Sequence, residues 1–205
     1  MPFSSFGLRT ELLDSIRQEG YTEPTPVQKR AIPLVLSGAD IMAAAQTGTG
    51  KTAAFALPVL QRLSEARASE RRPRVRALVL TPTRELAAQV AQSFMDYGRN
   101  LPLKTGLVFG GVPMVPQIEQ LRRGVDVLVA TPGRLLDHAG HGAVNLGNVE
   151  ILILDEADRM LDMGFVRDIR RILALLPPLR QNLLFSATFP PAVRMLAMEM
   201  MRNPV

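Results

Sequence analysis

The sequence predicts an α/β domain with a mostly parallel central sheet and helices on both faces. Three observations support this class. Short apolar runs, such as those at 77–80 and 151–154, alternate with longer segments of helical periodicity. These runs contain no polar residue, so both faces of each strand must be covered. A glycine-rich turn also follows an early apolar run, and sheets of this kind bind ligands at the carboxyl ends of their strands.

The first 36 residues predict two helices. An amphipathic helix lies within residues 1–22, because leucine and isoleucine recur there at helical spacing, and Gly20 ends it. A second helix begins at Pro26, with Thr25 as its N-cap. Pro33 is expected to kink this helix or to end its first part, because proline cannot donate to the helical hydrogen-bond ladder.

Strands and helices alternate along the rest of the chain. The segment 62–76 has six arginines and two glutamates, and we interpret its middle as an exposed connection rather than a nucleic-acid contact. The expected elements are strands at 40–45, 77–80, 105–109, 125–130, 151–154 and 183–185, and helices at 51–66, 83–97, 115–122, from about 133, across 156–176 and at 191–201.

Composition limits the class of protein. A chain of 205 residues suits one domain. The absence of cysteine excludes disulfides and thiolate metal sites, which fits a reducing, cytoplasmic location. No apolar run approaches the ~18 residues of a membrane span, and the N-terminus lacks the pattern of a signal peptide. The net charge of +5 favours a polyanionic partner, while the lack of tryptophan disfavours a base-stacking platform.

Residues 45–52, AQTGTGKT, have the layout of a phosphate-binding loop between a strand and a helix. The glycines let successive backbone N–H groups converge on phosphate oxygens, and the helix N-terminus adds its positive dipole. Lys51 would neutralise the outer phosphates, and the Thr52 hydroxyl would bind Mg²⁺. Ala45 stands where the usual pattern begins with glycine, which is feasible if φ there is negative. The alternative is an ordinary glycine-rich turn before a helix.

Polar clusters follow the other strands at the point where each ends. They are 81–86 (TPTREL), 110–111 (GG), 131–134 (TPGR), 155–158 (DEAD) and 186–188 (SAT). Parallel strands end on one edge of the sheet, so five such clusters predict one surface for ligand binding and chemistry.

The acidic cluster is the candidate catalytic centre. Asp155 is expected to hold Mg²⁺, directly or through water, because Mg²⁺ typically takes one or two carboxylates. Glu156 is expected to polarise the attacking water, with Lys51 and Asp155 as the other catalytic residues. The alternative is a helix N-terminus rich in acidic residues for dipole reasons.

These motifs, together with GYTEPTPVQ at 20–28, occur in the order typical of one family. The sequence resembles the N-terminal RecA-like domain of a DEAD-box ATP-dependent RNA helicase, and the bacterial RhlE-like group in particular. The resemblance covers essentially the whole chain and includes Ala45. It implies one RecA-like P-loop domain at 1–205, with an adenine-recognition region at 1–36, and a second RecA-like domain that this chain lacks.

The resemblance also implies roles for residues of the nucleotide site. Gln28 would read the adenine of ATP, since a side-chain amide offers one donor and one acceptor. Phe3 would stack on the base, although packing of the N-terminal helix is an equal alternative. Asp158 would couple the site to Ser186 and Thr188. This Ser-Thr pair has a second interpretation as an N-cap of the last helix, and the two are compatible. The implied nucleotide-binding residues are Phe3, Tyr21, Gln28, Thr47, Gly48, Thr49, Gly50, Lys51 and Thr52.

The implied RNA surface consists of small residues, helix starts and arginines, which bind phosphates without reading bases. Arg84 and Arg134 have an alternative as internal ion pairs, Arg84 with Glu85 or Glu119 for instance. His138 and His141 are expected in a surface loop rather than a metal site. The implied RNA-binding residues are Pro82, Thr83, Arg84, Gly110, Gly111, Thr131, Pro132, Gly133 and Arg134.

The resemblance therefore implies the ATP-binding half of an RNA-dependent ATPase that separates short duplexes and uses ATP and Mg²⁺. Full activity would need the second domain, and RNA-processing or ribosome-assembly proteins are the expected partners. The alternative is a non-catalytic module that binds RNA or protein and uses the nucleotide site as a switch. The intact Lys51, Thr52, Asp155 and Glu156 argue against an inactive enzyme. The literal DEAD sequence and the context of Gln28 disfavour a DNA translocase.

Overall fold

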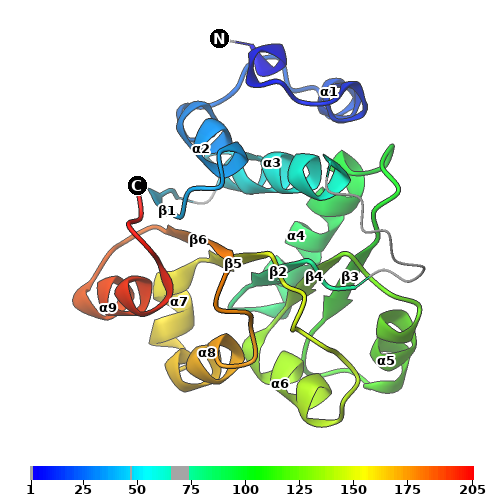
Figure 1. The fold of residues 1–205 in the computed structure, drawn as a ribbon, viewed down its shortest axis with the longest axis vertical. Helices are drawn as coiled ribbons and strands as arrows, with labels where there is room; N and C mark the ends of the chain where they lie inside the picture. Colours follow the sequence, from blue (N-terminus) through cyan, green and yellow to red (C-terminus); the bar gives the residue numbers. More distant parts are fainter. Residues whose placement is uncertain (1, 47, 66–73) are drawn as a thin grey trace.

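A computed structural model describes residues 2–46, 48–65 and 74–205 (Figure 1). Strands and helices alternate through most of the chain, as the sequence predicts. In chain order the elements are η1 (Phe3–Phe6), α1 (Thr10–Gln18), α2 (Pro26–Leu36), β1 (Ile41–Ala44), α3 (Lys51–Glu65), β2 (Ala77–Leu80), α4 (Arg84–Tyr97), β3 (Thr105–Val108), α5 (Val115–Arg122), β4 (Val127–Ala130), α6 (Pro132–Gly140), β5 (Ile151–Asp155), α7 (Ala157–Asp162), α8 (Val166–Leu173), β6 (Gln181–Ser186) and α9 (Pro191–Met200).

The described strands form one sheet in the order β1-β6-β5-β2-β4-β3, and every pair is parallel. Neighbouring strands end nearly level. Leu80 at the end of β2 lies opposite Ala130 of β4 and Leu154 of β5. The loops that follow these strands therefore begin side by side on one edge, which confirms the predicted gathering of the polar clusters.

Two hydrophobic cores cover the two faces of the sheet. Alternate residues of a strand enter opposite cores, so Val79 packs with helices α1 to α4, whereas Leu78 and Leu80 pack with α6 to α9. Figure 1 shows the first group of helices above the sheet and the second group below it. Each fully buried aliphatic side chain contributes about 1.5–3 kcal/mol, so this double burial is the main force that holds the layers together.

Most element boundaries agree with the sequence prediction to within a few residues. The N-terminal region differs in detail, because a 3₁₀ turn precedes α1 and the two are joined through Gly7 at φ 72°. Pro33 does not end α2, which continues past it to Leu36, so of the two predicted effects only a kink stays a prediction. The predicted connection within 62–76 lies mostly outside the described residues.

Local signals explain where α4 begins and ends. The Thr83 side chain accepts a hydrogen bond from the backbone N–H of Leu86 at 3.3 Å and so caps the helix. Gly98 ends it, and its N–H donates to the carbonyl of Phe94.

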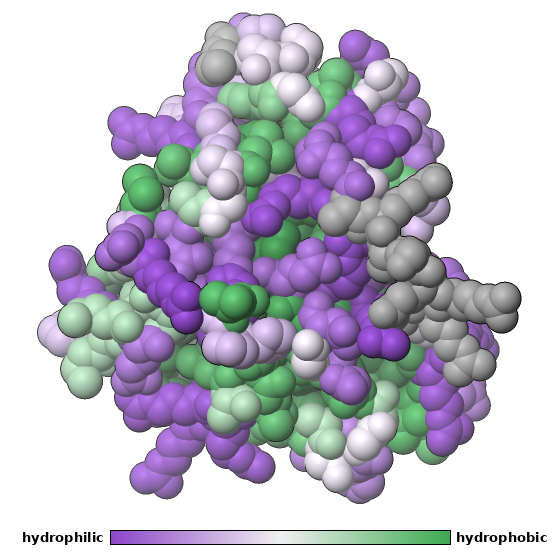
Figure 2. Space-filling model, in the orientation of Figure 1, coloured by the Kyte–Doolittle hydropathy of each residue, from purple (hydrophilic) through white to green (hydrophobic). Residues whose placement is uncertain are grey.

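Figure 2 shows hydrophilic side chains gathered across the middle of one face of the molecule, with hydrophobic patches around them. No helix in the described part of the chain is long and apolar enough to cross a membrane.

Candidate functional site

The strand order separates the predicted motifs into two groups. The strands that carry the glycine loop, the acidic cluster and the Ser-Thr pair are β1, β5 and β6, which are neighbours in one half of the sheet. The strands that lead into the predicted RNA motifs are β2, β4 and β3, which are neighbours in the other half. The two candidate surfaces thus lie on one edge and meet where β5 pairs with β2.

The glycine loop connects β1 to α3. Gly48 and Gly50 have φ of 84° and 83°, a conformation that residues with a side chain rarely adopt. The Thr49 hydroxyl donates to the carbonyl of Gln46 at 2.7 Å. Thr47 lies outside the described residues. The loop ends as α3 begins at Lys51, so the lysine is held at a helix N-terminus, where an anion is favoured.

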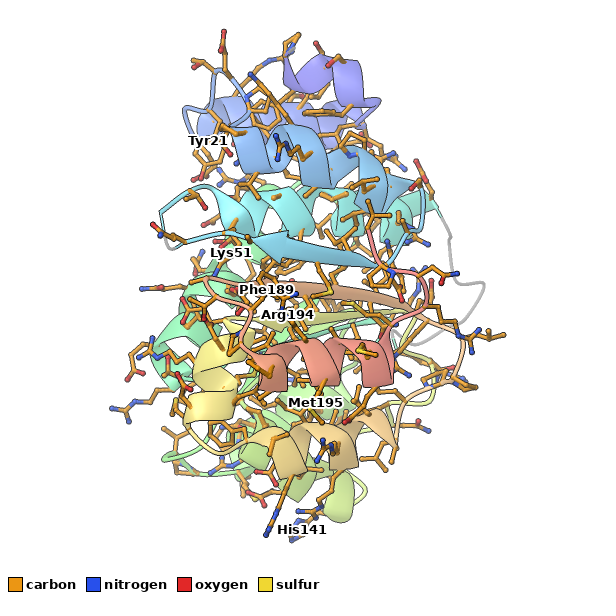
Figure 3. The ribbon with its side chains drawn as sticks, turned by 90° about the vertical axis from the view of Figure 1, so that its left-hand side faces the viewer. Tyr21, Lys51, His141, Phe189, Arg194 and Met195 are labelled. Atoms are coloured by element: carbon orange, nitrogen blue, oxygen red, sulfur yellow. The ribbon has the colours of Figure 1, made fainter. Side chains whose placement is uncertain are left out.

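Lys51 reaches from the glycine loop to the acidic cluster. Its Nζ lies 2.6 Å from Asp155 Oδ1 and 3.7 Å from Glu156 Oε1. The Lys51 side chain is 6 % exposed and that of Asp155 is 0 % exposed. Burial raises the pKa of Asp155, and the charge of Lys51 opposes this shift. Figure 3 shows Lys51 and Tyr21 on the same side of the molecule.

The donor set near Lys51 suits a hard divalent cation. Asp155 Oδ2 is buried and has no hydrogen-bond partner among the described residues. Thr52, on the first turn of α3, offers a hydroxyl oxygen. No group of three or more His, Cys, Asp or Glu side chains in the described chain could hold a metal. A site with one carboxylate fits Mg²⁺, because this ion keeps several of its waters and takes one or two carboxylates.

Glu156 has an unusual backbone conformation. Its φ of 55° and ψ of 53° are left-handed, although it is not a glycine, and α7 begins directly after it. Such a conformation costs about 1–2 kcal/mol and is often found at active sites. Glu156 also accepts a hydrogen bond from Arg159 Nη1 at 3.3 Å.

Asp158 lies between the ends of β5 and β6. Its Oδ2 accepts hydrogen bonds from the backbone N–H and the hydroxyl of Thr188, at 2.9 and 2.8 Å, and its own N–H donates to Ser186 Oγ at 3.1 Å. Burial acts to raise the pKa of Asp158, but hydrogen bonds, chiefly from Thr188, outweigh it and hold the pKa below its usual value. The N-cap alternative for this Ser-Thr pair was wrong, because α9 is preceded by Pro190 and has no side-chain cap.

Gln28 holds the glycine loop from α2. Its Oε1 accepts from the Thr25 N–H at 2.9 Å, and its Nε2 donates to the Gly50 carbonyl at 3.0 Å. The residue is 3 % exposed. One N–H and one lone pair of the amide remain for a ligand. A Cβ at Gly50 would lie 2.5 Å from Gln28 Nε2, so a side chain there would force this amide to move.

We expect Gly50→Ala to lower the free energy of unfolding by about 3 kcal/mol, because it adds left-handed strain and also displaces Gln28. Gly48→Ala is the matched control. Its φ is equally positive, but apart from its chain neighbours no atom of the described residues lies within 4 Å of the added Cβ, so its cost is about 1 kcal/mol. Urea denaturation of both variants measures the difference, and equal losses would show that Gln28 does not constrain the loop.

The two aromatic residues predicted at the nucleotide differ in exposure. Phe3 is 5 % exposed and packs edge-on against Phe6, with ring centroids 6.2 Å apart. The packing alternative therefore describes Phe3 in this structure, and base stacking stays a prediction. Tyr21 is partly exposed, and its hydroxyl lies 3.0 Å from the hydroxyl of Tyr97. Burial raises the pKa of Tyr97, so this phenol stays neutral and available for the hydrogen bond.

The predicted RNA residues lie at the ends of β2, β3 and β4. Arg84 forms an exposed ion pair with Glu85 at 2.6 Å, as its alternative anticipated. Arg134 Nη1 donates to the Val112 carbonyl at 2.9 Å, and its Nε lies 3.7 Å from Asp137. The exposed members are Arg84 and Gly111; Thr83, Gly110, Gly133 and Arg134 are half-buried; Pro82, Thr131 and Pro132 are buried.

The prediction that both histidines lie in a surface loop was wrong for His138. Helix α6 extends to Gly140, and His138 is fully buried on it, with its Nε2 2.9 Å from Gln117 Oε1. His141 is exposed at the end of the helix, as expected. Sequence reasoning did not predict the buried hydrogen bond between Gln117 and His138. The available signal was the four-residue spacing of Arg134 and His138, which places both on one side of a helix.

In this α/β domain a glycine loop faces a buried acidic residue from the end of another strand. This is the arrangement of P-loop nucleotide-binding proteins, so the fold and the site assign the chain to that class. Comparison with known proteins identifies the family within this class. The family described as "DEAD/DEAH box helicase" matches residues 25–196. The chain therefore belongs to the DEAD/DEAH box helicase family.

Relatives and a solved structure agree with this assignment. The chain is 43 % identical to "ATP-dependent RNA helicase CshA" of Limosilactobacillus reuteri over 100 % of its length. It is 44 % identical to "DEAD-box ATP-dependent RNA helicase RhpA" of Helicobacter pylori over 99 %. It spans 40 % of each of these relatives. The solved structure of a DEAD box protein from the hyperthermophile Methanococcus jannaschii is also similar, with 41 % identity and a TM-score of 0.93. The match covers 100 % of this chain and 55 % of that protein's chain.

Proposed function

We propose that the chain is the N-terminal, ATP-binding half of an RNA helicase that couples RNA-dependent ATP hydrolysis to local, sequence-independent unwinding of duplexes. The observation that carries this proposal is the buried pair of Lys51 and Asp155 at the glycine loop, in a chain of the DEAD/DEAH box family. A second RecA-like domain is the proposed partner for full activity. The span of only 40 % of the relatives' length supports this.

In the proposed mechanism Lys51 leaves Asp155 and binds the outer phosphates of ATP, so that the ion pair is exchanged for a phosphate contact. Thr52 and Asp155 would hold Mg²⁺, which when bound neutralises developing charge on the phosphates. Glu156 orients and polarises the attacking water. Gln28 selects adenine with the N–H and the lone pair that its internal hydrogen bonds leave over.

The RNA half of the proposal concerns the ends of β2, β3 and β4. Backbone N–H groups at the start of α4 and α6, together with Arg84, would bind the phosphates of a single strand. Because such contacts read no bases, binding should be independent of sequence and weaken with salt, with log K falling by about 0.7 per neutralised phosphate. Asp158, through Ser186 and Thr188, would transmit the state of the nucleotide to this surface.

We also propose a subgroup, a cellular location and partners for this protein. The GYTEPTPVQ segment supports the bacterial RhlE-like group, although the relatives reported above carry the names CshA and RhpA. The absence of cysteine supports a cytoplasmic location. RNA-processing or ribosome-assembly proteins are the proposed partners.

ATP turnover with and without single-stranded RNA tests the proposal, on the full-length protein that carries this domain. We expect RNA to stimulate turnover, and Glu156→Gln to reduce it at least 100-fold while ATP affinity stays within about threefold. Asp162→Asn, an exposed acid at the end of α7, is the matched control and should behave like the wild type. ATP binding without RNA-stimulated turnover would instead favour a module that uses the nucleotide as a switch.

A further inference from the structure

His138 is a buried titratable residue that the proposed mechanism does not use. It lies on α6, one turn after Arg134, and it is fully buried. Its Nε2 is 2.9 Å from Oε1 of Gln117 on α5, and its Nδ1 has no hydrogen-bond partner among the described residues. Burial lowers the pKa of His138, and the nearby charge of Arg134 acts in the same direction, so the ring is held neutral.

The orientation of Gln117 determines the tautomer of His138. Gln117 Nε2 donates to the Phe109 carbonyl at 3.0 Å, so Gln117 Oε1 must be the acceptor that faces the histidine. His138 therefore carries its proton on Nε2. This leaves Nδ1 unprotonated and without a hydrogen-bond partner among the described residues, which costs less than burying a charged ring. The result is a chain of two directed hydrogen bonds from α6 through α5 to Phe109.

Two side chains hold the segment that contains Gly110 and Gly111. Gln117 binds the carbonyl of Phe109, which precedes the two glycines, and Arg134 binds the carbonyl of Val112, which follows them. Gly111 has a φ of 82°, so glycine permits a conformation here that the two hydrogen bonds then fix. The N-terminus of α6 and the glycine pair are thus joined into one unit.

We propose that the hydrogen-bonded chain of His138 and Gln117 positions the Gly110–Gly111 segment against the start of α6, as a preformed cradle for RNA phosphates. The inference rests on the proposed RNA-binding function. His138 and Gln117 act as positioning residues, because both are buried and neither reaches the surface. Arg134 also positions the segment, since its guanidinium donates a hydrogen bond to the Val112 carbonyl. Preorganised donors bind an anion more tightly because less ordering is needed on binding.

The tautomer is the first readout. Long-range ¹H–¹⁵N spectra of the 205-residue chain should show His138 protonated at Nε2 and His141, whose Nδ1 lies 2.7 Å from the Asp137 carbonyl, protonated at Nδ1. Gln117→Leu should shift the His138 nitrogen signals, because it removes the acceptor. A His138 protonated at Nδ1 in the wild type, or one whose signals do not respond to Gln117→Leu, would overturn the proposed chain of hydrogen bonds.

RNA affinity is the second readout, measured as the anisotropy of a labelled ten-nucleotide single strand. We expect His138→Leu to weaken binding about tenfold, equal to about 1.4 kcal/mol at 25 °C, and to leave ADP affinity unchanged. His138→Gln should restore most of the affinity, because glutamine places an N–H near the position of Nε2. His141→Leu, at the C-cap of the same helix, is the matched control and should bind like the wild type.

The outcomes separate this inference from the proposed function. A wild-type chain that binds no RNA up to millimolar concentration, while the spectra show the expected tautomer, would contradict the RNA-binding function. A wild type that binds RNA and a His138→Leu variant that binds it equally well would overturn the positioning role alone. Equal losses of RNA and ADP affinity, or no rescue by His138→Gln, would show a general effect on folding and overturn it as well.

Discussion

Lys51→Met should abolish detectable nucleotide binding and also lower the free energy of unfolding by about 3 kcal/mol at pH 7. Two separate causes combine. The variant lacks the cation that would meet the outer phosphates, and it leaves Asp155, with 0 % of its side chain exposed, without a partner. Breaking a buried ion pair from one side typically costs 3–5 kcal/mol, and partial protonation of the carboxylate reduces the loss. Calorimetry with ADP and urea denaturation measure the two effects.

The double variant Lys51→Met/Asp155→Asn separates these causes. Removing the orphaned charge should restore most of the stability but none of the nucleotide affinity. Arg76→Met is the matched control, because Arg76 forms a partly buried ion pair with Glu150 at the start of β2. It should lose stability and keep nucleotide affinity. If the Lys51→Met variant is as stable as the wild type, Lys51 does not pair with Asp155 in solution.

Gln28→Glu should lower ADP affinity at least tenfold and bring the affinities for ADP and GDP to within about threefold of each other. The substitution keeps an oxygen for the Thr25 N–H but replaces the donor that faces the Gly50 carbonyl. It therefore removes both the remaining N–H for adenine and one support of the glycine loop. Calorimetric titrations with both nucleotides give the selectivity ratio directly.

Gln61→Glu is the control for that prediction. Gln61 is equally buried on α3, but its oxygen accepts from the Arg9 N–H and its amide contacts Glu65, away from the loop. We expect this variant to lose stability and to keep its preference for ADP. Unchanged selectivity in Gln28→Glu would contradict the adenine-reading role and leave only the structural support of the loop.

Much of the fold was predictable because the runs at 77–80, 127–130 and 151–154 are continuous and apolar, and because helices such as α4 have boundary signals of their own. The strand at 77–80 and the helix at 115–122 were predicted with their observed bounds. Strand order was not predictable from these signals. Nothing local to the 181–186 segment says that it lies between β1 and β5, since this depends on how two cores close around the whole sheet.

The candidate site was predictable where the functional residues lie within short motifs, as at the glycine loop and the acidic cluster. Contacts between distant residues were not. The composition of 138–142, HAGHG, favours a loop, whereas in the structure α6 continues to Gly140 and His138 is buried, with a hydrogen bond to Gln117 of α5. Phe3 illustrates the same limit, because an aromatic residue near the N-terminus suits a ligand or a core equally, and here it joins the core.

The left-handed backbone of Glu156 implies a trade-off between stability and activity. Glycine at this position would relieve strain of about 1–2 kcal/mol, a gain that is large for a protein whose total stability is 5–15 kcal/mol. The carboxylate would be lost with the strain. The residue in this conformation directly precedes α7, and its Oε1 lies 3.7 Å from Lys51 Nζ. The strain that weakens the fold therefore falls on the acidic residue that lies beside the lysine.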